Sequence, residues 1–265
     1  MKMRQEIKEL AREGMALQRG NAILIVLVYM LISSAWTLLQ EILNIGNVSV
    51  NAFTLLSFLM GGMFLPIYVF ISMPLLVGMY GACIKIYNKA PTGVGEMFSG
   101  GFDGNYLRKV GGMAWVWLWI ILWSLLLVIP GIVKLYSYSM TPFILAQFPK
   151  VTATEALKIS MRMTHGYKAD IFFLGLSFIG WYLLFLVPTI ILRTILAPFL
   201  GQTLSFSLAM TVVYSLYVMP YYYTALAGLY QELRDKALAE GRVTYEELGM
   251  AEPVAAAPHQ PMVIY

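Results

Sequence analysis

The sequence predicts an all-α membrane protein with six transmembrane helices, and two observations support this fold class. The first is composition: 59% of the residues are hydrophobic and only 12% are charged, whereas a soluble domain is about 45–50% apolar and about 25% charged. The second is patterning, because the apolar residues gather into several long runs that are almost free of charge, the mark of membrane spans. A transmembrane domain is therefore expected over residues 22–232.

The first 21 residues are rich in charge and predict an amphipathic lead-in helix on the membrane surface. Ile7, Leu10 and Ala11 fall near one helical face, with the lysines, arginines and glutamates elsewhere. A docking helix for a partner protein is the alternative. The apolar run that follows lacks a convincing small-residue cleavage site, so it is expected to remain as the first span.

The apolar runs define the expected spans and the loops between them. Residues 85–109 predict a polar loop with glycine-rich turns, and residues 193–203 predict a second loop. The tail, residues 233–265, is charged and then rich in alanine and proline, which predicts a cytoplasmic segment that is largely disordered, above all beyond Gly249. The six expected spans are residues 22–39, 63–84, 110–129, 132–148, 171–192 and 204–230.

Pro130 and Gly131 stand between the third and fourth spans and predict a tight turn near the outer surface. Pro130 can start a turn because its ring fixes φ, and Gly131 can adopt positive φ without steric cost. The alternative is a kink within one continuous helix, which would leave a single crossing there.

Positive charge favours the turn over the kink. Residues 1–21, 85–109, 149–170 and the tail carry 16 of the 18 lysines and arginines. Cytoplasmic loops are enriched in these residues, and only two crossings between residues 110 and 148 put all four segments on one side. Both termini are then expected in the cytoplasm.

An internal repeat supports the same topology. Trp123 precedes Pro130 by seven residues, and Trp181 precedes Pro188 by seven. Each unit continues with a Tyr-Ser pair, then a proline five residues after the serine, which is Pro142 in the first unit and Pro220 in the second. We therefore expect the third and fourth spans, and the fifth and sixth, to form two hairpins repeated in the same direction.

Residues 152–165 predict a short amphipathic helix on the cytoplasmic face. Thr152 and Glu155 have capping-box spacing, and Gly166 suits the carboxyl-terminal stop. Leu157 is expected to face the acyl chains, as is Met161, while Lys158 and Arg162 face anionic lipid headgroups. The alternative is that this helix packs on the ends of the spans and does not meet lipid.

The sequence shows no catalytic, cofactor or metal constellation. Ionisable residues avoid the centres of the expected spans, and the two histidines lack ligands at metal-binding spacing. The lone Cys83 is expected to be a packing residue. Tyr221, Tyr222 and the tyrosine after them point in three directions about a helix, so at least one should face the bundle interior. Packing is one interpretation of these tyrosines, and an aromatic wall facing a ligand is the other.

Five segments of the chain carry a family resemblance: IKELAREGMALQRGNAILI, EMFSGGF, LWSLLLVIPGIVKLYSYSMTPFILA, EALKISMRMTHGYKADIFFLGLSFIGW and PYYYTALAGLYQEL. With these segments the chain resembles a bacterial membrane family known only as domain-of-unknown-function family 975, which is common in Gram-positive bacteria. The resemblance covers nearly all of the chain except the tail, and it implies location in the cytoplasmic membrane but no activity, substrate or catalytic residue. One departure is the segment QRGN at residues 18–21.

Two functions of different class fit these observations. The first is a non-enzymatic membrane scaffold or accessory component with no cofactor, which contacts membrane lipids and either a membrane protein partner or a second copy of itself. The second is a transporter or flippase for an apolar or amphipathic substrate, which would need no buried charge. The net charge of +4 is explained by loop residues and predicts no nucleic-acid partner.

Overall fold

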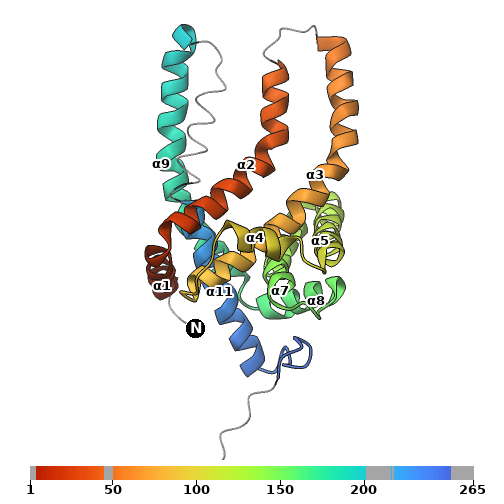
Figure 1. Ribbon diagram of the computed structural model, residues 1–265, viewed down its shortest axis with the longest axis vertical. Coiled ribbons are helices and arrows are strands. Elements are labelled where there is room, and N and C mark those ends of the chain that lie inside the picture. The colour runs from red at the N-terminus through yellow and green to blue at the C-terminus, as the bar shows by residue number, and fades with distance from the viewer. Residues whose placement is uncertain (1–3, 45–49, 201–215, 217, 252–265) are drawn as a thin grey trace, which may run out of the picture.

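The computed structural model is helical throughout the elements that it describes (Figure 1). It describes residues 4–44, 50–200, 216 and 218–251, without the side chains of residues 35–68, 182, 185–186, 188–189 and 191–200. Long helices rise from a body in which shorter helices pack together. The helices are α1 (Arg4–Leu17), α2 (Arg19–Asn44), α3 (Val50–Tyr87), α4 (Val94–Gly101), α5 (Tyr106–Leu126), α6 (Val128–Tyr138), α7 (Thr141–Gln147), α8 (Ala153–Thr164), α9 (Lys168–Leu200) and α11 (Met219–Ala239).

Three stretches of the described chain are long and apolar enough to cross a membrane. They are Val69–Tyr87, Tyr106–Leu126 and Val128–Gln147, with mean hydropathies of 1.8, 1.5 and 1.2. A fourth results if α1 and the first part of α2, which meet at a 98° bend, are counted as one broken span. The expected span at residues 204–230 falls largely on residues 201–215 and 217, outside the described part. The all-helical class is confirmed, and the number six stays a prediction.

The chain does turn between the third and fourth expected spans, but the turn is not at Pro130 and Gly131. Helix α5 ends at Leu126, and Leu127 is extended with φ −159° and ψ 141°. The proline explains this position, because its ring would clash with the carbonyl four residues earlier, that of Leu126, in a continuous helix. Pro130 itself lies in the first turn of α6, where no backbone N–H has a partner within the helix.

Gly131 is helical, and its φ is not positive. A Cβ atom at Gly131 would lie 2.3 Å from Oγ and 2.9 Å from Cα of Ser124. The glycine is therefore needed because α5 and α6 approach closely there, and not because the turn needs a left-handed residue. The hairpin was predicted correctly, and the role assigned to Gly131 was wrong.

The two predicted repeat units are alike at one proline and differ at the other. Pro142 is the second residue of α7 and Pro220 is the second residue of α11, so each begins a new helix, a position that proline favours. By contrast, α9 continues through Pro188, whereas α5 ends before Pro130. The two hairpins are therefore not structurally equivalent at the first proline of each unit.

Two expected loops contain helix. Residues 85–109 include α4, and α9 extends to Leu200 across the loop expected at residues 193–203. Helix α4 forms because its glycines pack against α3. A Cβ atom at Gly101 would lie 2.8 Å from the carbonyl oxygen of Pro74, and one at Gly78 would lie 2.0 Å from that of Met97. Glycine signalled a turn in sequence, but here it permits close helix packing.

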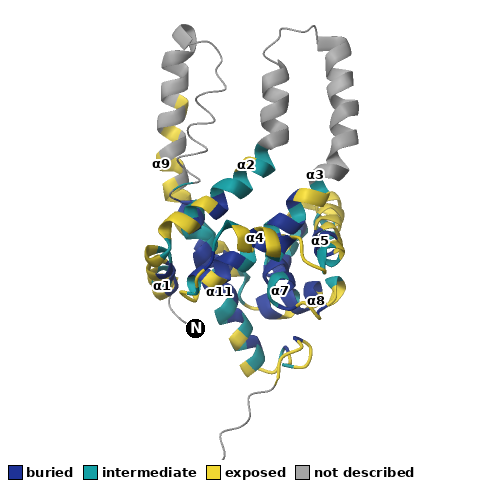
Figure 2. Cartoon of the chain, viewed as in Figure 1, coloured by how far each residue is buried: buried dark blue, intermediate teal, exposed yellow. Residues whose placement is uncertain are grey.

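The carboxyl-terminal half of α3 is the centre of the body, and α1, α2, α4, α5, α7 and α11 all contact α3. Helix α1 meets it at Gly14, where a Cβ atom would lie 2.3 Å from the carbonyl oxygen of Ile86. Helix α11 meets it at Gly228, where a Cβ atom would lie 2.3 Å from the ring of Tyr87. Figure 2 shows buried residues where α7, α8 and α11 gather, and exposed ones along α1, α5 and α9.

The close contact between α3 and α4 leads to a stability prediction. The substitution Gly78→Ala should destabilise the protein by about 1–3 kcal/mol, because backbone atoms of α4 must move to admit the methyl group. The matched control is Gly81→Ala on the same helix, whose Cβ would meet only the Cβ of Ala146 at 3.4 Å. Thermal unfolding of both purified variants in detergent measures the difference. Equal melting temperatures for the two variants would contradict the proposed close packing.

Candidate functional site

The candidate site is a basic groove beside α8, and the helix that forms it begins as predicted. The Thr152 side chain accepts a hydrogen bond from the Glu155 backbone N–H at 3.4 Å. The Glu155 carboxylate accepts one from the Thr152 backbone N–H at 2.9 Å, which completes the capping box. The helix ends at Thr164, and Gly166 follows with φ +83°, a left-handed conformation that favours glycine.

The apolar face of α8 is covered by protein rather than left for acyl chains. Leu157 is 5% exposed and packs in a cluster with Val116 of α5 and Tyr138 of α6, and Met161 is half-buried at the edge of that cluster. The predicted contact of Leu157 with lipid is therefore wrong, because Leu157 packs on the middle of α5 and the end of α6. Met161 is partly exposed, so its contact with lipid stays a prediction. Periodicity identified the buried face correctly, but it could not show what covers that face.

Ser160 and Thr164 fasten α8 to α6 from this buried face. The Ser160 hydroxyl donates to the carbonyl oxygen of Ser137 at 2.8 Å, and the Met140 backbone N–H donates to the Ser160 hydroxyl at 3.2 Å. The Thr164 hydroxyl lies 3.3 Å from the same Ser137 carbonyl oxygen. These bonds satisfy carbonyl and N–H groups where the helix breaks between α6 and α7.

Lys158 and Arg162 lie on the exposed side of α8 and line an open groove of about 700 Å³. The opposite wall of the groove comes from the segment after α11. Arg162 forms an ion pair with Glu247 at 2.9 Å, and this hydrogen bond is the main reason why the pKa of Glu247 lies below its usual value. The groove residues are Lys158, Met161, Arg162, His165, Arg242 and Glu247.

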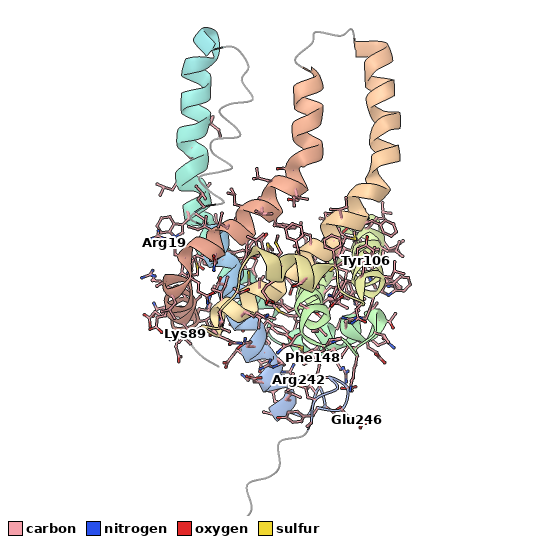
Figure 3. The ribbon with its side chains drawn as sticks, viewed as in Figure 1. Arg19, Lys89, Tyr106, Phe148, Arg242 and Glu246 are labelled. Atoms are coloured by element: carbon pink, nitrogen blue, oxygen red, sulfur yellow. The ribbon has the colours of Figure 1, made fainter. Side chains whose placement is uncertain are left out.

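Arg242 joins this segment to the end of α8. Its Nη1 donates to the carbonyl oxygens of Arg162 at 2.7 Å and of His165 at 3.1 Å. The Arg162 carbonyl also accepts from the His165 backbone N–H at 3.4 Å, so Arg242 adds to the bonding at this helix end, where a cation also favours the helix dipole. Figure 3 places Arg242 at the lower end of α11, beside the loop that carries Glu246. Sequence analysis missed this role because the two partners are 77–80 residues apart.

The first part of the expected disordered tail is folded. Helix α11 runs to Ala239, and in the segment after it Val243 and Leu248 are each 2% exposed within the hydrophobic core. Tyr167 adds a polar contact, since its hydroxyl lies 3.2 Å from the Glu240 carboxylate. Lys236 lies over the same ring at 4.5 Å. Residues 252–265 lie outside the described part, so disorder there stays a prediction.

Two further basic residues connect other helices of the body. Arg108 at the start of α5 donates to the carbonyl oxygens of Leu145 at 2.7 Å and Val151 at 2.6 Å, around the end of α7. The Lys109 side chain is 2% exposed and pairs with Asp103 at 2.6 Å. Both residues were counted in sequence as loop charges, but the structure uses them to hold helices together.

The predicted tyrosine cluster packs against other aromatic side chains. The Tyr221 and Tyr222 rings lie 5.1 Å and 5.4 Å from the Phe178 ring of α9. The third tyrosine, Tyr223, lies 5.6 Å from Tyr80 of α3. These contacts favour the packing interpretation for Tyr222 and Tyr223, whereas Tyr221 both packs on Phe178 and lines a cavity. Tyr221 also reaches α1, because its hydroxyl donates to the Lys8 carbonyl oxygen at 3.3 Å.

The arrangement offers hydrogen-bond donors and positive charge but no nucleophile with an adjacent base. Within the described residues, no group of three or more His, Cys, Asp or Glu side chains could hold a metal ion. Cys83 is a free cysteine buried within α3. What the groove can do chemically is bind an anion.

The Arg242 contacts predict that the carboxyl-terminal segment stabilises α8. Arg242→Ala should lower the unfolding free energy by about 2 kcal/mol, because it removes charge-assisted hydrogen bonds to the carbonyls of Arg162 and His165 at the end of α8. Arg242→Lys is the matched control, since it keeps the charge but cannot span several carbonyls. Protection of the α8 amides from hydrogen exchange reports the effect directly. Full protection in the alanine variant would contradict the capping role.

Comparison with known proteins places this chain in a family but links it to no characterised activity. No curated protein and no solved structure matches the chain. A family model described as a protein of unknown function, DUF975, matches residues 67–237, which is more than half of the chain. That range includes the carboxyl-terminal part of α3, all of α8 and most of α11, but it ends before Arg242 and Glu247, which form one wall of the α8 groove. The chain belongs to the DUF975 family.

Proposed function

We propose that this protein is a non-enzymatic scaffold or accessory component of a membrane, with several crossings and both termini in the cytoplasm. The membrane placement is supported by the tip of the α5–α6 hairpin. Five consecutive apolar residues there are each at least 64% exposed: Leu125, Leu126, Leu127, Val128 and Ile129. A surface of this kind is unfavourable in water and favourable among acyl chains.

The observation that carries the scaffold function is that polar side chains join helices α5, α7, α8 and α11 to one another or to the segment after α11. Arg108 connects α5 to α7, and Arg242 connects the carboxyl-terminal segment to α8. The Tyr230 hydroxyl of α11 donates to the Gln147 side chain of α7 at 2.7 Å. A protein whose polar contacts serve rigidity presents a fixed surface, which is what a scaffold requires.

The α8 groove is the surface proposed for contact. Lys158 and Arg162 are exposed there and close to His165. At a cytoplasmic membrane surface each cation would contribute ~1 kcal/mol of attraction to anionic headgroups. An acidic segment of a membrane protein partner would use the same charges.

Lipid transport is the competing function, and reconstitution separates the two. The full-length protein is placed in vesicles with a fluorescent lipid, and dithionite is added outside to quench the outer leaflet. We expect about half of the fluorescence to remain, because a scaffold does not move lipid between leaflets. Empty vesicles are the control for leakage and spontaneous exchange. Loss of nearly all fluorescence within minutes, without leakage, would overturn the scaffold function in favour of a flippase.

A further inference from the structure

A second cavity lies at the elbow between α1 and α2, away from the α8 groove. The chain bends by 98° there. The cavity has a volume of about 390 Å³ and is bounded by α1, the first residue of α2, α9 and the start of α11. Figure 3 places Arg19 at this junction, near the base of α9. The lining residues of this elbow cavity are Arg12, Met15, Ala16, Arg19, Phe178, Trp181, Val218 and Tyr221.

Positive charge gathers on the α1 side of the elbow cavity. Arg12 and Arg19 are both exposed and both line it. The Arg12 guanidinium lies 5.9 Å from the centre of the Tyr221 ring, and the Lys8 ammonium lies 4.8 Å from that of Phe178. Glu13, the acid next to Arg12 in sequence, instead pairs with Lys89 at 2.9 Å.

The rest of the lining is apolar and leads away from the charges along α9. Phe178 and Val218 are 5% and 3% exposed and form a closed wall. Trp181 is 53% exposed at the open side, and Leu184, one turn further along α9, is 60% exposed. An apolar chain that leaves the cavity would therefore continue along exposed apolar side chains.

These features select one class of ligand. Guanidinium groups match the geometry of a phosphate, with which they form paired hydrogen bonds. A sugar phosphate or nucleotide would also need polar partners for its hydroxyls or base, whereas the remaining lining residues are mostly apolar. An anionic head joined to an apolar chain satisfies both halves of the cavity.

We propose that the elbow cavity binds a single anionic phospholipid, with its phosphodiester at Arg12 and Arg19 and the upper part of one acyl chain against Phe178, Trp181 and Val218. This inference rests on the membrane placement proposed above. It extends the scaffold function by assigning a specific lipid to the lead-in helix. The bound lipid would tie α1, which carries the charge, to α9 and α11, which carry the apolar wall.

Photo-crosslinking of the full-length protein tests this site. The amino acid p-benzoylphenylalanine replaces Trp181, which is exposed and aromatic, so the change is tolerated. The protein is irradiated in bilayers of equal phosphatidylglycerol and phosphatidylcholine, and adducts are identified by mass. We expect the phosphatidylglycerol adduct to exceed the phosphatidylcholine adduct about tenfold, because both lipids present a phosphodiester but only phosphatidylcholine also carries a choline cation, which Arg12 and Arg19 repel. Equal yields of the two lipid adducts would overturn the proposal. This first test leaves Arg12 and Arg19 unchanged.

Charge variants then test which residues cause the preference for phosphatidylglycerol over phosphatidylcholine. Arg12→Gln and Arg19→Gln should each remove most of this preference. The matched control is Arg4→Gln, on the same helix, whose guanidinium lies over Phe173 at 4.9 Å and outside the cavity. An equal loss in the control would show general surface attraction and overturn the site. Loss of the phosphatidylglycerol adduct when glycerol phosphate is present during irradiation would also overturn it, since a soluble anion would then suffice.

The two proposals can fail separately. Rapid lipid exchange between leaflets together with a strong phosphatidylglycerol adduct would exclude the scaffold function and leave the lipid site intact. Absence of lipid exchange together with equal adduct yields would exclude the lipid site and leave the scaffold function intact.

Discussion

The close approach of neighbouring helices to the carboxyl-terminal half of α3 is the constraint on which the body depends. Helices α1, α4 and α11 come near enough that a Cβ atom at Gly14, Gly78 or Gly228 would lie 2.0–2.3 Å from an atom of the facing element. Such contacts gain dispersion energy over many atom pairs. They also hold α1 and α11 in place, and therefore position both walls of the elbow cavity and the carboxyl-terminal segment beside α8.

A second level of organisation is the pairing of short helices with distant arginines. Helix α7 has 7 residues and α8 has 12, lengths that are marginal for an isolated helix in water. Arg108 binds carbonyls around the end of α7, and Arg242 binds carbonyls at the end of α8. Each guanidinium donates to carbonyls near the end of a short helix and joins that helix to a distant part of the chain. Helices α7 and α8 are thus stabilised by tertiary contacts more than by local helix propensity.

The limits of sequence inference follow from the same contacts. Local signals worked: the capping box at Thr152 and the stop at Gly166 depend on neighbours a few residues away. The break at Leu127 was displaced by three residues from Pro130 because proline acts on the carbonyl four residues before it. The covering of Leu157 by α5 and the capping by Arg242 depend on residues tens of positions distant. No periodicity or spacing within one segment carries that information.

The distribution of charge shows why a count of basic residues and a map of basic surface differ. Of the residues counted for orientation, Lys109 is buried against Asp103, and Arg108 and Arg242 are engaged with backbone carbonyls. These three contribute little to a surface that could attract headgroups. The expected cytoplasmic side of the basic segments does not depend on these contacts, because lysine and arginine act on topology while the chain inserts, before tertiary contacts form. Exposed cations that line a cavity, such as Arg12 at the elbow and Lys158 beside α8, are therefore the better guide to what the folded protein binds.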